Sequence, residues 1–166
     1  MPVRRATVAD ADTLHDLVCA LANYEKLRHK VIATANDLRA KLAPDASPPL
    51  HALLAEDDAG QPVGFAIYFA IYSTFRGNWG LYLEDLYVRP EARSRGHGYA
   101  LLQAVAQDAV SQGAQRLEWQ VLDWNQLALD FYERLGAKPM SGWVTMRLTG
   151  NALKDLGSED FRIEDA

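Results

Sequence analysis

The chain has 166 residues, 49% of them hydrophobic and 23% charged, which suits one globular domain and excludes a disordered or low-complexity protein. The longest apolar run, residues 63–72, is about half of what a membrane-spanning helix needs, and the single cysteine, Cys19, excludes an intrachain disulfide or a thiolate metal cluster. The 17 Lys and Arg against 22 Asp and Glu give a formal net charge of −5, which argues against duplex nucleic acid as a partner and is compatible with a cationic substrate.

The first half of the chain combines helical and alternating apolar patterns. Asp10 is expected to cap the first helix, while Thr34 and Asp37 form a capping-box pattern that opens a second helix, which Pro44 ends. The predicted elements, in chain order, are a strand at residues 3–6, helices at 10–27 and 34–43, and strands at 51–56, 63–72 and 81–88.

The second half is punctuated by residues that begin and end helices. Asn125 is a typical N-cap, and Gly113 and Gly136 stand where left-handed C-terminal caps are expected. The predicted elements are helices at 98–112 and 126–135 and strands at 116–122 and 142–148. The interleaved order predicts an α/β (α+β) fold, in which helices cover a mixed sheet.

The chain shows no linker and no repeat, so we predict one domain over residues 1–150, followed by a charged C-terminal tail over 151–166. The N-terminal region is interrupted by Asp10 and Asp12, which argues against a signal peptide and predicts a cytoplasmic protein without membrane contact. His15 and Cys19 have a helical metal-ligand spacing but no second pair, so we expect no metal site.

A glycine-rich turn joins the strand at 81–88 to the helix at 98–112. Gly96 and Gly98 leave room for close approach to the backbone, whose N–H groups at a helix N-terminus bind phosphate. Arg93 and Arg95 add positive charge, and His97 either contacts a ligand or faces water, of which contact with water is the favoured interpretation. A phosphate-binding loop is the favoured interpretation, although a tight turn that merely needs glycine is the alternative.

The strand at 81–88 has a defect in its alternation. Leu81 and Leu83 occupy odd positions, whereas Leu86 and Val88 occupy even ones, so one face stays apolar only if an extra residue is inserted near Glu84. This pattern predicts a β-bulge, which would free backbone donors for a ligand and aim carboxylates into a cleft. A strand buried on both faces is the alternative.

The glycine-rich turn, the strand at 81–88 and a third segment at 123–137 together resemble the GNAT N-acetyltransferase superfamily. Arg93-Ser-Arg-Gly-His-Gly98 resembles its pyrophosphate loop, with Ser94 in place of a usual glycine; an overlapping match begins at Arg95. The chain is most similar to the spermidine/spermine (diamine) acetyltransferase group. The segments that carry this likeness are Asn23-Tyr-Glu-Lys-Leu27, Tyr82-Leu-Glu-Asp-Leu-Tyr-Val88, Asp123-Trp-Asn125 and Phe131-Tyr-Glu-Arg-Leu-Gly-Ala137.

The resemblance implies a twisted, mostly antiparallel sheet and acetyl transfer from acetyl-CoA to a primary amine in a ternary complex, without a metal. It assigns Tyr132 as the acid that protonates the departing thiolate. Independently of the resemblance, an alkylammonium must lose a proton before it attacks, and Glu84 is the candidate base, directly or through water. Implied substrate residues are Tyr24, Glu25, Glu84 and Asp85. Implied coenzyme residues are Leu86, Tyr87, Val88, Arg93, Ser94, Arg95, Gly96, His97, Gly98, Tyr99, Asn125 and Ala128.

One departure from the group concerns the acceptor. A further acid expected before the strand at 81–88 falls at Thr74, which weakens spermidine or spermine as substrate and leaves a shorter diamine, thialysine or another lysine-like amine. Two alternatives remain: a protein or peptide acceptor, and a CoA-binding regulatory module without catalysis. The resemblance also favours a homodimer.

Overall fold

The computed structural model describes residues 2–158 and divides the chain into two compact units, Met1–Gln120 and Val121–Ala166. The strands are β1 (Val3–Arg5), β2 (His51–Glu56), β3 (Pro62–Ser73), β4 (Asn78–Val88) and β5 (Leu117–Trp119). The α-helices are α1 (Ala11–Tyr24), α2 (Ala35–Leu42), α3 (His97–Ser111), α4 (Gln126–Arg134) and α5 (Gly150–Leu156). Short 3₁₀ turns lie at Val8–Asp10, Arg28–Lys30 and Pro90–Ala92.

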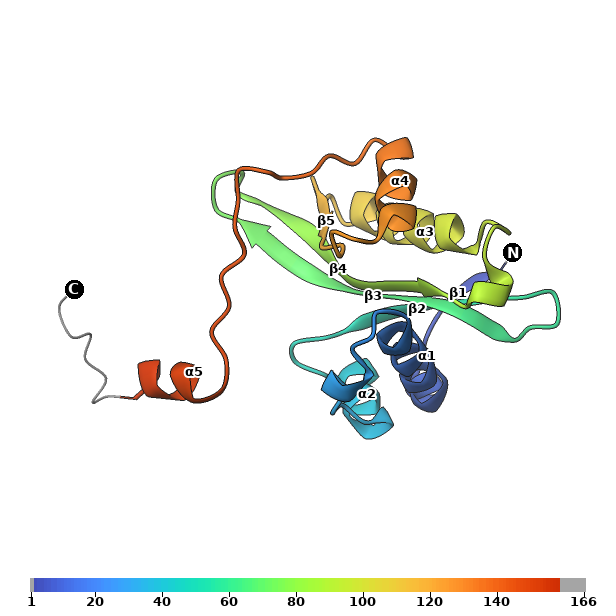
Figure 1. The fold of residues 1–166 in the computed structure, drawn as a ribbon, viewed down its shortest axis with the longest axis horizontal. Coiled ribbons are helices and arrows are strands. Elements are labelled where there is room, and N and C mark those ends of the chain that lie inside the picture. The colour runs from blue at the N-terminus through green and yellow to red at the C-terminus, as the bar shows by residue number, and fades with distance from the viewer. Residues whose placement is uncertain (1, 159–166) are drawn as a thin grey trace. The chain divides into compact units, whose positions relative to one another are not determined.

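A single sheet in the order β1-β2-β3-β4-β5 organises the first unit. Strands β1 to β4 are antiparallel neighbours, and β5 runs parallel to β4. Helices α1 and α2 cover one face of the sheet and α3 covers the other (Figure 1). The predicted mixed sheet covered by helices is therefore confirmed.

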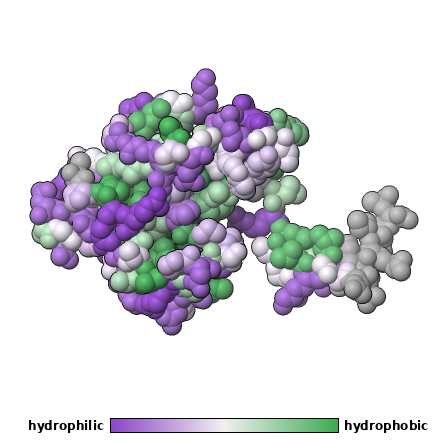
Figure 2. All heavy atoms as spheres, turned by 180° about the vertical axis from the view of Figure 1, so that it is seen from behind, coloured by the Kyte–Doolittle hydropathy of each residue, from purple (hydrophilic) through white to green (hydrophobic). Residues whose placement is uncertain are grey.

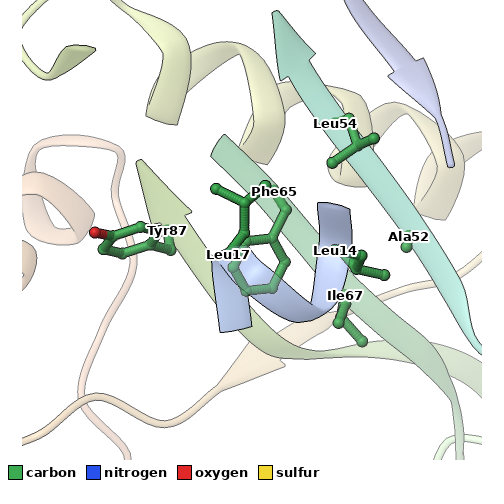
Figure 3. Close-up of a cluster of buried hydrophobic side chains, with 7 residues drawn as sticks. All are labelled: Leu14, Leu17, Ala52, Leu54, Phe65, Ile67 and Tyr87. Atoms are coloured by element: carbon green, nitrogen blue, oxygen red, sulfur yellow. The ribbon is translucent and has the colours of Figure 1, made fainter. Parts of the chain in front are cut away.

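The core on the α1 face is built from alternate residues of neighbouring strands, as the period-2 geometry of strands requires. Leu14 and Leu17 of α1 lie over Phe65 and Ile67 of β3, and all four are at most 3% exposed. Figure 3 shows this cluster, with Tyr87 of β4 at its border. This packing fixes α1 against the two central strands.

The α3 face combines an apolar stripe with a polar clamp. Leu101 and Val105 of α3 are fully buried. The hydroxyl of Tyr68 on β3 donates a hydrogen bond to Asp108 of α3, which also accepts one from Arg5 of β1 at 2.6 Å. Asp108 thus joins α3 to β1 and β3 on the face of the sheet opposite to α1.

The first helix begins where predicted and ends earlier. Asp10 occupies the N-cap position of α1, but its side chain makes no capping hydrogen bond to that helix; Thr7 caps the preceding 3₁₀ turn, and Asp10 accepts the Thr7 N–H at 2.8 Å in a capping box. Arg4 donates two hydrogen bonds to the Asp10 carboxylate and lowers its pKa to about 2. Helix α1 ends at Tyr24, three residues before the predicted end. The Thr34 and Asp37 capping box of α2 is confirmed.

The C-terminal prediction is partly wrong. No strand forms over residues 142–148 of the described chain, because local alternation supplies no partner for the backbone N–H and C=O groups. Instead α5 forms inside the predicted tail, of which residues 159–166 lie outside the described residues. Figure 2 shows hydrophobic side chains gathered on this part, where Leu153 and Leu156 are exposed. Strand β5 covers only residues 117–119 of the predicted strand at 116–122.

Within residues 2–158, no helix has the length and apolar character needed to cross a bilayer.

Candidate active site

A β-bulge in β4 is the centre of the site. Ile67 pairs with Asp85 and Tyr68 pairs with Leu83, so Glu84 is the extra residue without a partner on β3. The predicted bulge is confirmed at the predicted position, and its effect is to keep Leu83 and Leu86 on the same face although they are three residues apart. Glu84 is exposed at the bulge.

The bulge also turns Asp85 towards the α1 face. Paired residues of antiparallel strands share a face, and Asp85 and Tyr87 pair with the core residues Ile67 and Phe65. Burial, together with the negative charges of Glu84 and Glu25, raises the pKa of Asp85 to about 7. The carboxyl group of Asp85 therefore interacts electrostatically with those of Glu25 and Glu84.

Glu25 reaches this cluster because α1 stops abruptly. The Glu25 N–H bonds to the Leu21 carbonyl at 2.9 Å, and Leu27 N–H closes the turn on the Ala22 carbonyl at 2.7 Å. This turn requires a left-handed residue, and Lys26 adopts that conformation with φ 61°. Burial raises the pKa of Glu25, which is half-buried at the helix end.

The edge of β4 after the bulge is open on the β5 side. Strand β5 pairs only with Leu81, Tyr82 and Leu83, and no strand among residues 2–158 continues that pairing over Leu86, Tyr87 and Val88. An extended ligand arm with amide groups can therefore add to this edge as a further strand does.

The predicted loop forms at the N-terminus of α3. Gly96 precedes the helix with φ 85°, and Ser94 adopts the same left-handed region with φ 60°, so this serine takes the conformation that glycine favours. A Cβ at Gly98 would meet only Val88, at 3.8 Å. The loop presents the N-terminal end of a 15-residue helix, which favours an anion.

Two side chains of the loop differ from what their positions in the sequence indicate. His97 is 4% exposed, so its expected contact with water is wrong; it begins the buried stripe of α3, and its Nδ1 has no hydrogen-bond partner among the described residues. Arg93 turns towards α1, where its Cζ lies 4.4 Å from the Tyr24 ring centroid. Arg95 and Tyr99 are exposed.

The remaining predicted residues lie in the second unit. The Asn125 side chain accepts the Ala128 N–H at 3.3 Å, which confirms Asn125 as the N-cap of α4. Tyr132 lies in the last turns of this helix, with its ring centroid 5.3 Å from that of Phe131. Thr74, at the position of the missing acid, lies in the exposed turn between β3 and β4 of the first unit.

The residues described contain no group of three or more His, Cys, Asp or Glu side chains arranged to hold a metal ion. The His15 ring instead bonds to the Ala33 carbonyl at 2.9 Å.

Comparison with known proteins settles the family. Residues 14–137 match the model of the acetyltransferase (GNAT) family. The chain belongs to the GNAT acetyltransferase family. This acetyltransferase is 36% identical to the thialysine N-epsilon-acetyltransferase of Bos taurus, over 95% of the chain and 97% of that protein. It is 32% identical to the L-ornithine N5-acetyltransferase NATA1 of Arabidopsis thaliana, over 93% of the chain and 86% of that protein.

The fold of the acetyltransferase has solved counterparts. An integron cassette protein of V. cholerae matches with a TM-score of 0.77 and 24% identity, over 95% of the chain and 98% of that structure. The family membership makes the chain an enzyme that transfers an acetyl group to an amine, with acetyl-CoA as the donor.

Proposed function

We propose that the acetyltransferase acts on the primary amine of a small dicationic or lysine-like substrate, such as thialysine, ornithine or a short diamine. The observation that carries this proposal is the convergence of Glu25, Glu84 and Asp85 beside the bulge. Three acids in one place attract an ammonium group, and a second ammonium on the substrate has an acid left to pair with. The relatives named for thialysine and ornithine support a substrate of this size.

Acetyl-CoA is proposed to bind along β4 and the α3 loop. The diphosphate takes the backbone N–H groups of the loop and the side chain of Arg95, while the pantetheine arm lies along the edge formed by Leu86, Tyr87 and Val88. The open edge and the left-handed turn at Ser94 and Gly96 support this placement. The residues of this proposed coenzyme site in the second unit are Asn125 and Ala128.

The chemistry then needs one base and one acid. An alkylammonium of pKa about 10.4 is only about one part in 2,500 neutral at pH 7, so the attacking nitrogen must lose a proton. Glu84, exposed at the bulge, is the proposed base, directly or through water. Backbone N–H groups near Leu86 stabilise the oxyanion of the attacked thioester, and Tyr132 protonates the departing thiolate.

The test is release of free CoA thiol from acetyl-CoA with a panel of acceptors: thialysine, ornithine, lysine, putrescine, spermidine and a lysine-containing peptide. Release is expected with the lysine-like amines and the short diamine, above a control without amine that measures thioester hydrolysis. Release with the peptide alone would replace the small-amine proposal with a protein acceptor. No release with any acceptor, while CoA still binds, would replace it with a CoA-binding regulatory module.

Two further parts of the proposal follow from composition and resemblance. We propose a cytoplasmic homodimer whose partners are small molecules and include neither nucleic acid nor membrane. The resemblance to the diamine acetyltransferase group supports the dimer, and the formal charge of −5 supports the exclusion of nucleic acid. Light scattering of the purified protein measures the oligomeric state directly.

A further inference from the structure

The side chain of Arg93 is engaged on the α1 side of the loop. Its Cζ lies 4.4 Å from the ring centroid of Tyr24 and 5.7 Å from that of Tyr87, distances at which a guanidinium is attracted to an aromatic face. Its Nε donates a hydrogen bond to the Val88 carbonyl at 3.0 Å. The side chain is half-buried. Arg93 therefore joins the end of α1 to the end of β4.

Each of these two ends carries one acid of the acceptor site. Tyr24 is the last residue of α1 and directly precedes Glu25, whose own backbone is held by the turn that closes on Leu21. Tyr87 lies two residues after Asp85 on the same face of the sheet, because both pair with core residues of β3. A contact that fixes Tyr24 against Tyr87 therefore also fixes Glu25 relative to Asp85.

The electrostatics of the site agree with this arrangement. The Glu25 carboxylate contributes to the raised pKa of Asp85, so the two acids lie close enough to interact. Arg93 contacts the rings of Tyr24 and Tyr87, and its Nε donates to the Val88 carbonyl. Arg95, in contrast, is exposed in the loop.

We propose that Arg93 is a positioning residue of the amine site: by stacking on Tyr24 and bonding to Val88, it holds Glu25 opposite Asp85 and sets affinity for the cationic acceptor. The side chain does not serve as a ligand of the coenzyme diphosphate. This inference rests on the proposed small-amine function, and it separates two arginines of one loop into two roles, Arg93 for the acceptor and Arg95 for the coenzyme.

The first test compares Arg93→Met and Arg93→Lys with Arg95→Met. For Arg93→Met, the KM of the amine at saturating acetyl-CoA is expected to rise about tenfold, with kcat within about twofold and the Kd of CoA, by calorimetry without amine, within about twofold. Arg93→Lys keeps the cation and is expected to raise the KM less. Arg95→Met is expected to weaken CoA without changing the KM of the amine.

The second test is a double-mutant cycle with Glu25→Gln. If Arg93 acts through Glu25, the double variant Arg93→Met, Glu25→Gln has the amine KM of Glu25→Gln alone, a result that a general loss of structure does not produce. The denaturant midpoint of each variant shows whether it is folded. If Arg93→Met does not fold, Arg93→Lys replaces it in the cycle.

Three results would overturn the inference. If both Arg93 variants bind CoA more weakly, Arg93 is a ligand of the coenzyme diphosphate. If the increases in the amine KM multiply in the double variant, Arg93 does not act through Glu25. If the wild-type protein binds CoA but transfers acetyl to no small amine, the proposed function itself fails; the first two results leave that function intact.

Discussion

Asp85 is a carboxyl group held where its charged form is disfavoured. Its pKa is raised to about 7 by burial and by two neighbouring acids, against 3.8 for a solvated aspartate. The unfolded chain loses this proton near pH 4 while the folded chain keeps it to near pH 7. Ionised Asp85 therefore lowers the free energy of unfolding, and this penalty grows between about pH 4 and pH 7 and is complete above pH 7.

Replacement of Asp85 by asparagine removes that penalty. We expect Asp85→Asn to be more stable than the wild type by about 2 to 4 kcal/mol at pH 8 and to differ little below pH 4. Urea unfolding from pH 4 to pH 8 measures the difference. The matched control is Asp58→Asn, an exposed turn position, with an expected change under about 0.5 kcal/mol at every pH. Parallel pH profiles for Asp85→Asn and the wild type would refute the raised pKa of Asp85.

Tyr132 is assigned by motif, so its role has a direct kinetic test. Removing a general acid that protonates the CoA thiolate costs about 10²-fold or more in rate. Tyr132→Phe is therefore expected to lower kcat by about that factor and to leave the Kd of acetyl-CoA within about twofold. Tyr72→Phe, an exposed tyrosine of β3 with no assigned role, is the control. If turnover of Tyr132→Phe equals that of the wild type, another group supplies the proton.

At the scale of elements, the close approach of β3 and β4 positions the proposed coenzyme edge. A Cβ on Gly64 would lie 2.7 Å from the Tyr87 carbonyl oxygen and 3.3 Å from the Val88 Cα, and both atoms belong to the backbone. Neither can turn aside as a side chain can. Only glycine at this position lets the two strands keep their register beside Tyr87 and Val88.

Gly64→Ala is accordingly expected to lower the free energy of unfolding by about 1 to 3 kcal/mol, as overpacking of a well-packed site does. The KM of acetyl-CoA is expected to rise as well, because the displaced residues form the proposed pantetheine edge. Urea denaturation and initial rates measure the two effects. Gly142→Ala, where a Cβ meets no atom within 4 Å, is the control. Equal stability of the two variants would contradict the clash.

Comparison of the predicted and observed elements shows which features of the fold could be predicted from the sequence. The phase shift between Leu83 and Leu86 predicted the bulge, with a strand buried on both faces as the alternative, and the pairing register confirms the bulge. Capping residues placed the start of α2 and of α4, since their hydrogen bonds are local. The prediction of a strand at 142–148 was wrong because a strand needs a neighbouring strand to pair with, and alternating apolar residues do not identify one. The stacking of Arg93 on Tyr24 joins two segments that are far apart in the sequence, so no local sequence pattern predicts it.

At the scale of the whole molecule, charge is divided between two ligands of opposite sign. The formal charge of −5 disfavours an anionic coenzyme, yet the loop carries Arg95 and a helix N-terminus, the proposed diphosphate site. The acids Glu25, Glu84 and Asp85 offer the opposite field on the other side of β4. Net charge alone therefore does not decide binding; the local arrangement of charges in the first unit does.

This division predicts how salt affects the reaction. Because attraction to the acid cluster scales with substrate charge, kcat/KM for a dicationic amine is expected to fall about tenfold between about 0.02 M and 0.5 M NaCl, and for a monocationic amine of similar length about threefold. Acetyl-CoA is kept saturating at each salt concentration so that its own screening does not enter. In Glu25→Gln the two salt dependences are expected to move closer together, since one of the attracting carboxylates is gone. Equal salt dependence for both amines in the wild-type protein would mean that a single ammonium is recognised, and would restrict the proposed substrate to a monoamine.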